Sequence, residues 1–234
     1  MRSSGNAGSF SPGGQPDVAQ PTTQSYRQES DALGAVDVPL SAYWGVHTAR
    51  ALANFPLSGR AVRPELVRAM ALVKLACCRA NGELGYLPQP EAQAIADACR
   101  EVAQGGLSEF FVVDALQGGA GTSTNMNMNE VLANRAEELL GGHLGSYARI
   151  DPLRHVNLHQ STNDVYPTCI KMTLYEAMDG LREQLSRLIG AMEANAARFD
   201  RVVKMGRTQL QDAVPIRLGQ EFAAYAAVLR REAA

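Results

Sequence analysis

The feature that most limits what this chain can fold into is an apolar stripe within residues 163–199. Its members recur at spacings of three and four, the period of a helix face, and are Ile170, Leu174, Ala177, Leu181, Leu185, Leu188, Met192 and Phe199. At 1.5 Å per residue, the stretch that they span predicts a rod of about 45 Å. A helix of this length with one apolar face is too long for a small globule and is typical of a helical bundle.

Shorter helices are predicted on either side of the stripe. Before it, proline and glycine signals bound three helices, over residues 64–84, 90–104 and 123–140. After it, we expect a loop around Lys204–Pro215 and a further helix from Ile216. The segment 31–62 is punctuated by prolines and glycines and is expected to be loop-rich. With 35 alanines in 234 residues, the composition agrees with a mainly all-α fold.

The chain divides into three predicted parts. Residues 1–28 are mostly small and polar, so we expect a disordered tail; two arginines make a transit peptide a weaker interpretation. Residues 29–150 form an N-terminal helical domain, and residues 151–234 form the first helices of a bundle. The last helix shows no glycine, asparagine or proline stop signal. We therefore expect a longer protein of which this is the front part.

Composition and charge exclude several classes of function. The net charge is −2 without a basic stretch, which argues against nucleic acid as the main partner, and no apolar run is long enough to span a membrane. The four cysteines lack metal or redox spacing, so we expect reduced thiols in a cytoplasmic protein; they are Cys77, Cys78, Cys99 and Cys169. Nor do the histidines show a metal spacing; they are His47, His143, His155 and His159. No metal or organic cofactor is implied.

Three segments are rich in hydroxyl and amide side chains: residues 118–125, 160–164 and 204–212. Each is predicted at or just before a helix start, where unpaired N–H groups and the helix dipole favour anions. The alternative for any single segment is that its serine, threonine and asparagine residues only cap a helix. Together the three segments hold more hydroxyl and amide groups than capping needs, which favours an anion site.

These segments resemble the signatures of the aspartase/fumarase superfamily. Residues 119–131 (GAGTSTNMNMNEV), 160–168 (QSTNDVYPT) and 206–215 (GRTQLQDAVP) match the first, second and third signatures, and residues 43–48 (YWGVHT) extend the match. Within the superfamily, four positions resemble the aspartate ammonia-lyase branch: Ala120, Ser123, Thr162 and Gln209. The resemblance implies an N-terminal helical lyase domain, the start of a central helical bundle, and elimination of ammonia from L-aspartate to give fumarate.

The resemblance also implies roles for individual residues. Thr122, Thr208 and Gln209 would act in catalysis, and the substrate carboxylates would bind at Thr122, Ser123, Ser161, Thr162, Asn163, Thr208 and Gln209. These neutral donors would stabilise the aci-carboxylate formed when the C3 proton leaves. Gln209, an amide, does not titrate and would not protonate the leaving group. Two local alternatives remain: Asn163 as a pure helix cap and Ser123 as a helix-start hydroxyl. His47 and His155 would at most lie near the pocket.

Family members are homotetramers in which three subunits assemble each active site, and their catalytic base is a serine in a Gly-Ser-Ser loop. No such loop occurs in this sequence. We therefore expect the three signatures not to meet within one chain, and residues 1–234 alone to lack lyase activity and to associate. A class II fumarase-like hydratase portion and a truncated, non-catalytic bundle subunit remain as alternative interpretations.

Overall fold

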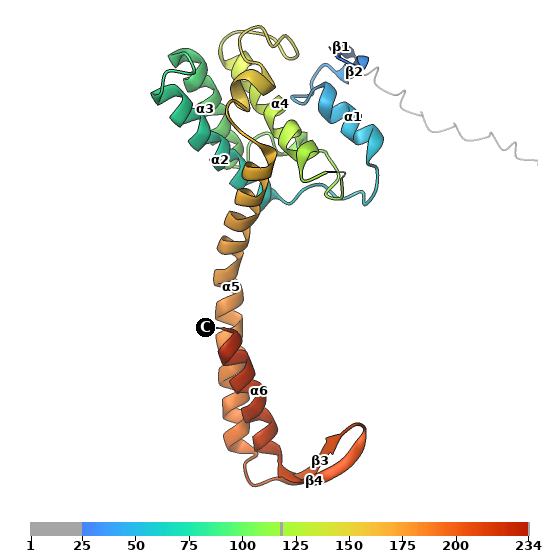
Figure 1. The fold of residues 1–234 in the computed structure, drawn as a ribbon, viewed down its shortest axis with the longest axis vertical. Coiled ribbons are helices and arrows are strands. Elements are labelled where there is room, and N and C mark those ends of the chain that lie inside the picture. The colour runs from blue at the N-terminus through green and yellow to red at the C-terminus, as the bar shows by residue number, and fades with distance from the viewer. Residues whose placement is uncertain (1–24, 118, 234) are drawn as a thin grey trace, which may run out of the picture.

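The computed structural model describes residues 25–117 and 119–233, and it separates into a globular head and a long rod (Figure 1). The head contains a strand hairpin and the first four α-helices. The rod is helix α5 (Thr162–Arg198), against whose far half helix α6 (Leu218–Glu232) packs. The mainly all-α fold predicted from the sequence is therefore confirmed. None of the described helices has the length and hydropathy needed to cross a membrane.

Three helices form the core of the head. Helix α2 (Pro64–Glu83) packs on α3 (Gln89–Ala103), and α3 packs on α4 (Thr122–Leu139). Each lies within two residues of its predicted range, because the proline at the start of α2 and the glycine turns between helices set the boundaries. Their facing sides bury an apolar cluster that includes Met70, Ile95, Cys99, Val131 and Leu132.

The entry segment is more regular than its composition indicates. Strands β1 (Tyr26–Asp31) and β2 (Gly34–Pro39) form an antiparallel hairpin, and helix α1 (Val46–Asn54) follows. The expected loop over 31–62 is thus wrong for these elements, and residues 26–28, expected in the tail, belong to β1. The rest of that predicted tail, up to residue 24, lies outside the described residues.

A buried carboxylate replaces the missing local cap of α1. The Oε2 atom of Glu130 accepts hydrogen bonds from the backbone N–H groups of Gly45 and Thr48, at 2.9 and 3.1 Å, and Oε1 accepts from His47 at 2.8 Å. This pairing links two segments far apart in sequence. It could not be anticipated from local helix-start signals, because the capping group lies on α4.

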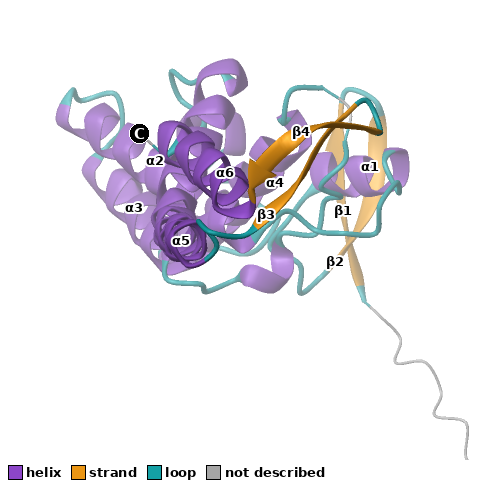
Figure 2. Ribbon diagram, turned by 90° about the horizontal axis from the view of Figure 1, so that it is seen from below, coloured by secondary structure: helices purple, strands orange, loops and turns teal. Residues whose placement is uncertain are grey.

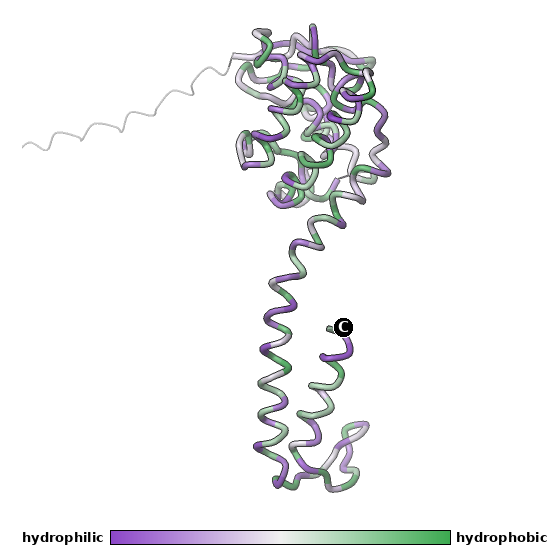
Figure 3. Tube along the Cα trace, turned by 90° about the vertical axis from the view of Figure 1, so that its left-hand side faces the viewer, coloured by the Kyte–Doolittle hydropathy of each residue, from purple (hydrophilic) through white to green (hydrophobic). Residues whose placement is uncertain are grey.

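The long stripe forms the predicted helix, but most of it faces solvent. Of the residues of α5, only Val165 and Cys169 are buried. Leu174 and Leu181 remain 60% and 59% exposed, and hydrophobic positions recur along the rod (Figure 3). Seen end-on, α5 has α6 beside it (Figure 2). One helix pair therefore leaves much of this apolar face uncovered within the chain.

The predicted loop around Lys204–Pro215 is a β-hairpin instead. Strands β3 (Val203–Thr208) and β4 (Gln211–Arg217) pair antiparallel at the far end of the rod, and α6 begins two residues later than expected (Figure 1). Cross-strand pairing overrides the turn-like composition. The third polar segment therefore lies on a hairpin and not at a helix start.

Burial keeps the cysteines in the thiol form. All four are free, and burial raises the pKa of Cys78 and of Cys169 to about 11. A thiol with so high a pKa is a poor nucleophile near neutral pH. This agrees with the expectation of structural thiols.

Candidate active site

The first signature places Thr122 and Ser123 in the first turn of α4. Gly121 precedes them in a left-handed conformation (φ 85°), and the Gln117 side chain caps the helix start, because its Oε1 accepts from the Thr124 backbone N–H at 2.9 Å. Thr122 is exposed and Ser123 half-buried. The next residue, Thr124, turns inward, where its hydroxyl accepts a hydrogen bond from Gln117 Nε2 at 2.5 Å. Thr122 and Ser123 thus stand in the first turn of α4 without serving as its cap, which Gln117 provides.

The second signature starts α5. Ser161 is the N-cap, and its Oγ accepts from the Asn163 backbone N–H at 3.2 Å. Thr162 is half-buried and accepts from Asn125 at Oγ1, whereas Asn163 is exposed. The capping interpretation therefore holds for Ser161 and fails for Asn163, which lies inside the first turn.

The starts of α4 and α5 lie side by side. The α-carbon of Gly121 packs against the Tyr166 ring so closely that a methyl group there would overlap it. Asn125 Nδ2 bridges the two helices by donating to Thr162 Oγ1 at 3.2 Å. The expectation that the three signatures stay apart is therefore wrong for the first two, because Thr122, Ser123, Ser161, Thr162 and Asn163 occupy neighbouring helix starts.

The third signature remains separate from the other two. Thr208 ends β3, and Gln209 and Leu210 form the tip of the hairpin. Both tip residues have positive φ, 50° and 62°, which non-glycine residues rarely adopt, and Leu210 is fully exposed. With 37 residues in α5, the far end of the rod, from which the hairpin projects, lies roughly 55 Å from Thr162. Expectation and structure agree here: Thr208 and Gln209 do not meet the first two signatures within one chain.

The chemistry of the paired helix starts suits an anion. Two helix N-termini and several neutral hydroxyl and amide side chains lie near one another there, which favours a carboxylate over a cation. Among the described residues, no cluster of histidine, cysteine, aspartate and glutamate could hold a metal ion.

Sequence reasoning missed the residues that support these helix starts. Asn125, Asn127 and Asn129 are buried on α4, and Asn157 precedes α5. Asn127 accepts from Val112 N–H and donates to the Phe110 carbonyl, which fixes the loop before α4. The alternation of asparagine and apolar residues in this helix could have indicated them, because buried amide side chains need hydrogen-bond partners.

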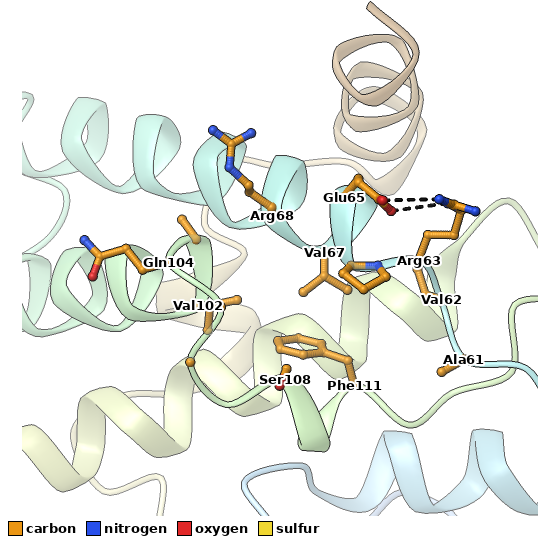
Figure 4. Close-up of a pocket in the computed structure, with 14 residues that line it drawn as sticks. Ala61, Val62, Arg63, Glu65, Val67, Arg68, Val102, Gln104, Ser108 and Phe111 are labelled. Atoms are coloured by element: carbon orange, nitrogen blue, oxygen red, sulfur yellow. Dashed lines mark hydrogen bonds and ion pairs between the residues drawn. The ribbon is translucent and has the colours of Figure 1, made fainter. Parts of the chain in front are cut away.

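A cavity of about 690 Å³ lies elsewhere, between the start of α2 and the end of α3. Its lining is mostly apolar and includes Val67, Val102 and Phe111, with the Arg63–Glu65 ion pair at its edge (Figure 4). None of the seven sequence-predicted site residues lines it. The cavity therefore does not mark the candidate site.

Comparison with known proteins identifies the family of this chain. Residues 34–234 match the lyase family Lyase_1. The chain belongs to this family. It is 50% identical over 212 residues to the aspartate ammonia-lyase of Pseudomonas fluorescens, covering 90% of this chain and 44% of that protein.

Solved structures show the same fold. A fumarate lyase:delta crystallin structure from Brucella melitensis matches with a TM-score of 0.79 and 53% identity, covering 89% of this chain and 49% of that one. A class II fumarase from Schistosoma mansoni matches with a TM-score of 0.77 and 38% identity, over 89% and 44% of the two chains. The chain thus spans about half the length of the relatives that it matches.

Proposed function

We propose that the protein carrying this chain is an aspartate ammonia-lyase that eliminates ammonia from L-aspartate to form fumarate. The observation that carries the proposal is the meeting of the starts of α4 and α5, where Thr122 and Thr162 stand together on two helix N-termini. Relatives named aspartate ammonia-lyase, about half identical over this chain, support it.

In this proposal the neutral donors bind the substrate carboxylates. Removal of the C3 proton places an extra negative charge on the β-carboxylate, and donors already aimed at its oxygens stabilise that intermediate more than the substrate. Thr122 and Thr208 supply hydroxyl donors, and Gln209 supplies an amide near the ammonium or the β-carboxylate. Ser123, Ser161, Thr162 and Asn163 complete the carboxylate contacts. No serine of this chain is assigned the role of general base.

We also propose that the protein assembles into a homotetramer. Thr208 and Gln209 reach a site only if the hairpin of one copy approaches the helix starts of another. Two observations support this: the apolar face of α5 is largely exposed, and Leu210 is fully exposed at the hairpin tip. Large exposed apolar surfaces mark interaction sites. We further propose residues 29–150 as the lyase head, residues 151–234 as the first part of the bundle, and the cytoplasm as the place of action.

The test is a direct assay of the full polypeptide that carries residues 1–234. Ultraviolet absorbance of fumarate is followed with L-aspartate and, separately, with L-malate as substrate. The proposal predicts turnover of aspartate and little of malate. Turnover of malate alone would assign a fumarase instead, as the similarity to the Schistosoma mansoni enzyme allows. Turnover of neither would favour the non-catalytic bundle subunit.

A further inference from the structure

A buried lysine lies behind the candidate site. Lys74 on α2 is 1% exposed, and its Nζ donates to Asn157 Oδ1 at 2.9 Å. A lysine this deeply buried normally pairs with a carboxylate. Among the described residues no carboxylate pairs with it, and the nearby cysteines are neutral thiols. The described part of the chain leaves this positive charge unmatched.

Hydrogen bonds connect Lys74 to the start of α5. Asn157 Oδ1 also accepts from Asn125 Nδ2 and from Asn129 Nδ2, each at 3.2 Å. The same Asn125 nitrogen donates to Thr162 Oγ1 at 3.2 Å. A chain of three hydrogen bonds therefore links Lys74 Nζ to the Thr162 hydroxyl. We name Lys74, Asn125, Asn129 and Asn157 the Asn157 cluster.

The cluster also holds the loop that leads into α5. Asn157 Nδ2 donates to the carbonyl of Gln160 at 3.1 Å, directly before the N-cap Ser161. The position of this loop, and with it the position of the second signature, therefore depends on a group fixed from behind by Lys74. Support of this kind is what keeps binding groups in productive geometry.

The cluster is costly to bury. The Oδ1 atoms of Asn125 and Asn129 are buried without a hydrogen-bond partner, and burial lowers the pKa of Lys74 to about 8. At pH 7 the ammonium form still dominates. Such costs concentrate where function requires them. An apolar residue at position 74 would pack there without the cost of burying a charge.

We propose that Lys74 is a positioning residue that fixes Thr162 through the Asn157 cluster and whose unmatched charge favours a substrate with two carboxylates at the starts of α4 and α5. The inference rests on the proposed function, because a dicarboxylate is the ligand concerned. Two carboxylates interact with the charge about twice as strongly as one does at the same distance, and the weak screening of a buried charge preserves that difference.

The test uses two variants of the full polypeptide. Lys74→Met removes both the charge and the donor while keeping the length of the stem, and Lys74→Gln removes the charge but keeps an N–H donor. Arg79→Met, at an exposed position on the same helix, is the matched control for loss of a positive charge. The readouts are kcat and KM for aspartate, the melting temperature, and inhibition by succinate and by its monoamide.

The proposal predicts that kcat/KM falls at least about tenfold in Lys74→Met and less in Lys74→Gln. Both variants should lose more affinity for succinate than for the monoamide and should melt no lower than the wild type, whereas Arg79→Met should match the wild type. If Lys74→Met does not fold, Lys74→Gln decides. Unchanged kcat/KM, or equal losses for the two inhibitors, would overturn the proposal. If the wild type does not deaminate aspartate, the proposed function fails, and calorimetry with the two inhibitors still tests Lys74.

Discussion

Gly121 and Tyr166 interlock the starts of α4 and α5. Gly121 has a φ of 85°, and a methyl group on its α-carbon would overlap the ring of Tyr166. Glycine satisfies both demands at this position, because it alone tolerates this φ freely and adds no side chain. The contact therefore determines how closely the first two signatures approach.

Gly121→Ala should accordingly separate the two helix starts. We expect it to destabilise the protein by about 2–4 kcal/mol, from backbone strain and overpacking together, and to reduce kcat/KM for aspartate more than tenfold, about the effect of misplaced binding groups. Gly119→Ala is the control, because Gly119 also has positive φ (77°) but meets only Thr122 Oγ1 at 3.6 Å. Denaturant unfolding and steady-state kinetics measure both effects. Equal losses in the two variants would refute the interlock.

The carboxylate of Glu130 should be needed for the start of α1. In the wild type, three backbone N–H groups donate to Oε1 and Oε2 of Glu130. In Glu130→Gln an amide nitrogen replaces one of these oxygens and cannot accept a hydrogen bond. We expect a loss of about 1–3 kcal/mol in unfolding free energy, the cost of leaving buried donors unpaired. The exposed Glu83→Gln serves as the control, and urea unfolding is the measurement. Stability equal to that of the control would show that α1 needs no cap from α4.

Burial of Lys74 predicts a pH dependence of stability with a definite sign. Its pKa is about 8 in the folded protein, against an ordinary value of 10.5. Between these values the unfolded chain binds more protons, so this group makes the protein more stable as pH rises from 8 to 10.5. Below pH 8, keeping Lys74 protonated inside the folded protein lowers the free energy of unfolding by on the order of 3 kcal/mol.

Lys74→Met removes that cost. Its stability relative to the wild type should be highest near pH 7 and should decline towards pH 10.5, as measured by urea unfolding of both proteins at several pH values. A difference that does not change with pH would show that Lys74 keeps its ordinary pKa. Arg79→Met, whose side chain is exposed, should show no such trend relative to the wild type.

The sequence predicted the helices well because their signals are local. The stripe through Leu174 and Leu181 has a strict helical period, and Pro64 and Gly85 mark the ends of α2 by their own backbone preferences. The two hairpins and α1 escaped prediction because cross-strand partners and Glu130, far away in sequence, stabilise them. Local composition does not predict partners that are distant in the sequence.

The candidate site was predictable in its residue types more than in its arrangement. Thr122 and Ser161 could be placed at helix starts from their neighbours alone. That these two starts meet depends on Gly121 and Tyr166, and that Lys74 lies behind them depends on packing among α2, α4 and α5. Neither follows from spacing along the chain. The placement of Thr208 on a hairpin was missed for the same reason.

In the proposed assembly, one site contains Thr122 and Thr208 from different copies of the chain. Thr122→Ala and Thr208→Val should each lower kcat for aspartate about 100-fold or more, since each removes a donor to the developing charge. The decisive measurement is the activity regained when these two variants of the full polypeptide are unfolded together and reassembled in equal amounts.

Random reassembly gives about one site in four with both threonines intact, if each site takes position 122 from one copy and position 208 from another. The mixture should therefore recover about a quarter of the wild-type activity, while either variant reassembled alone should stay at about a hundredth of it or less. A mixture no more active than its two parents would contradict a site shared between copies.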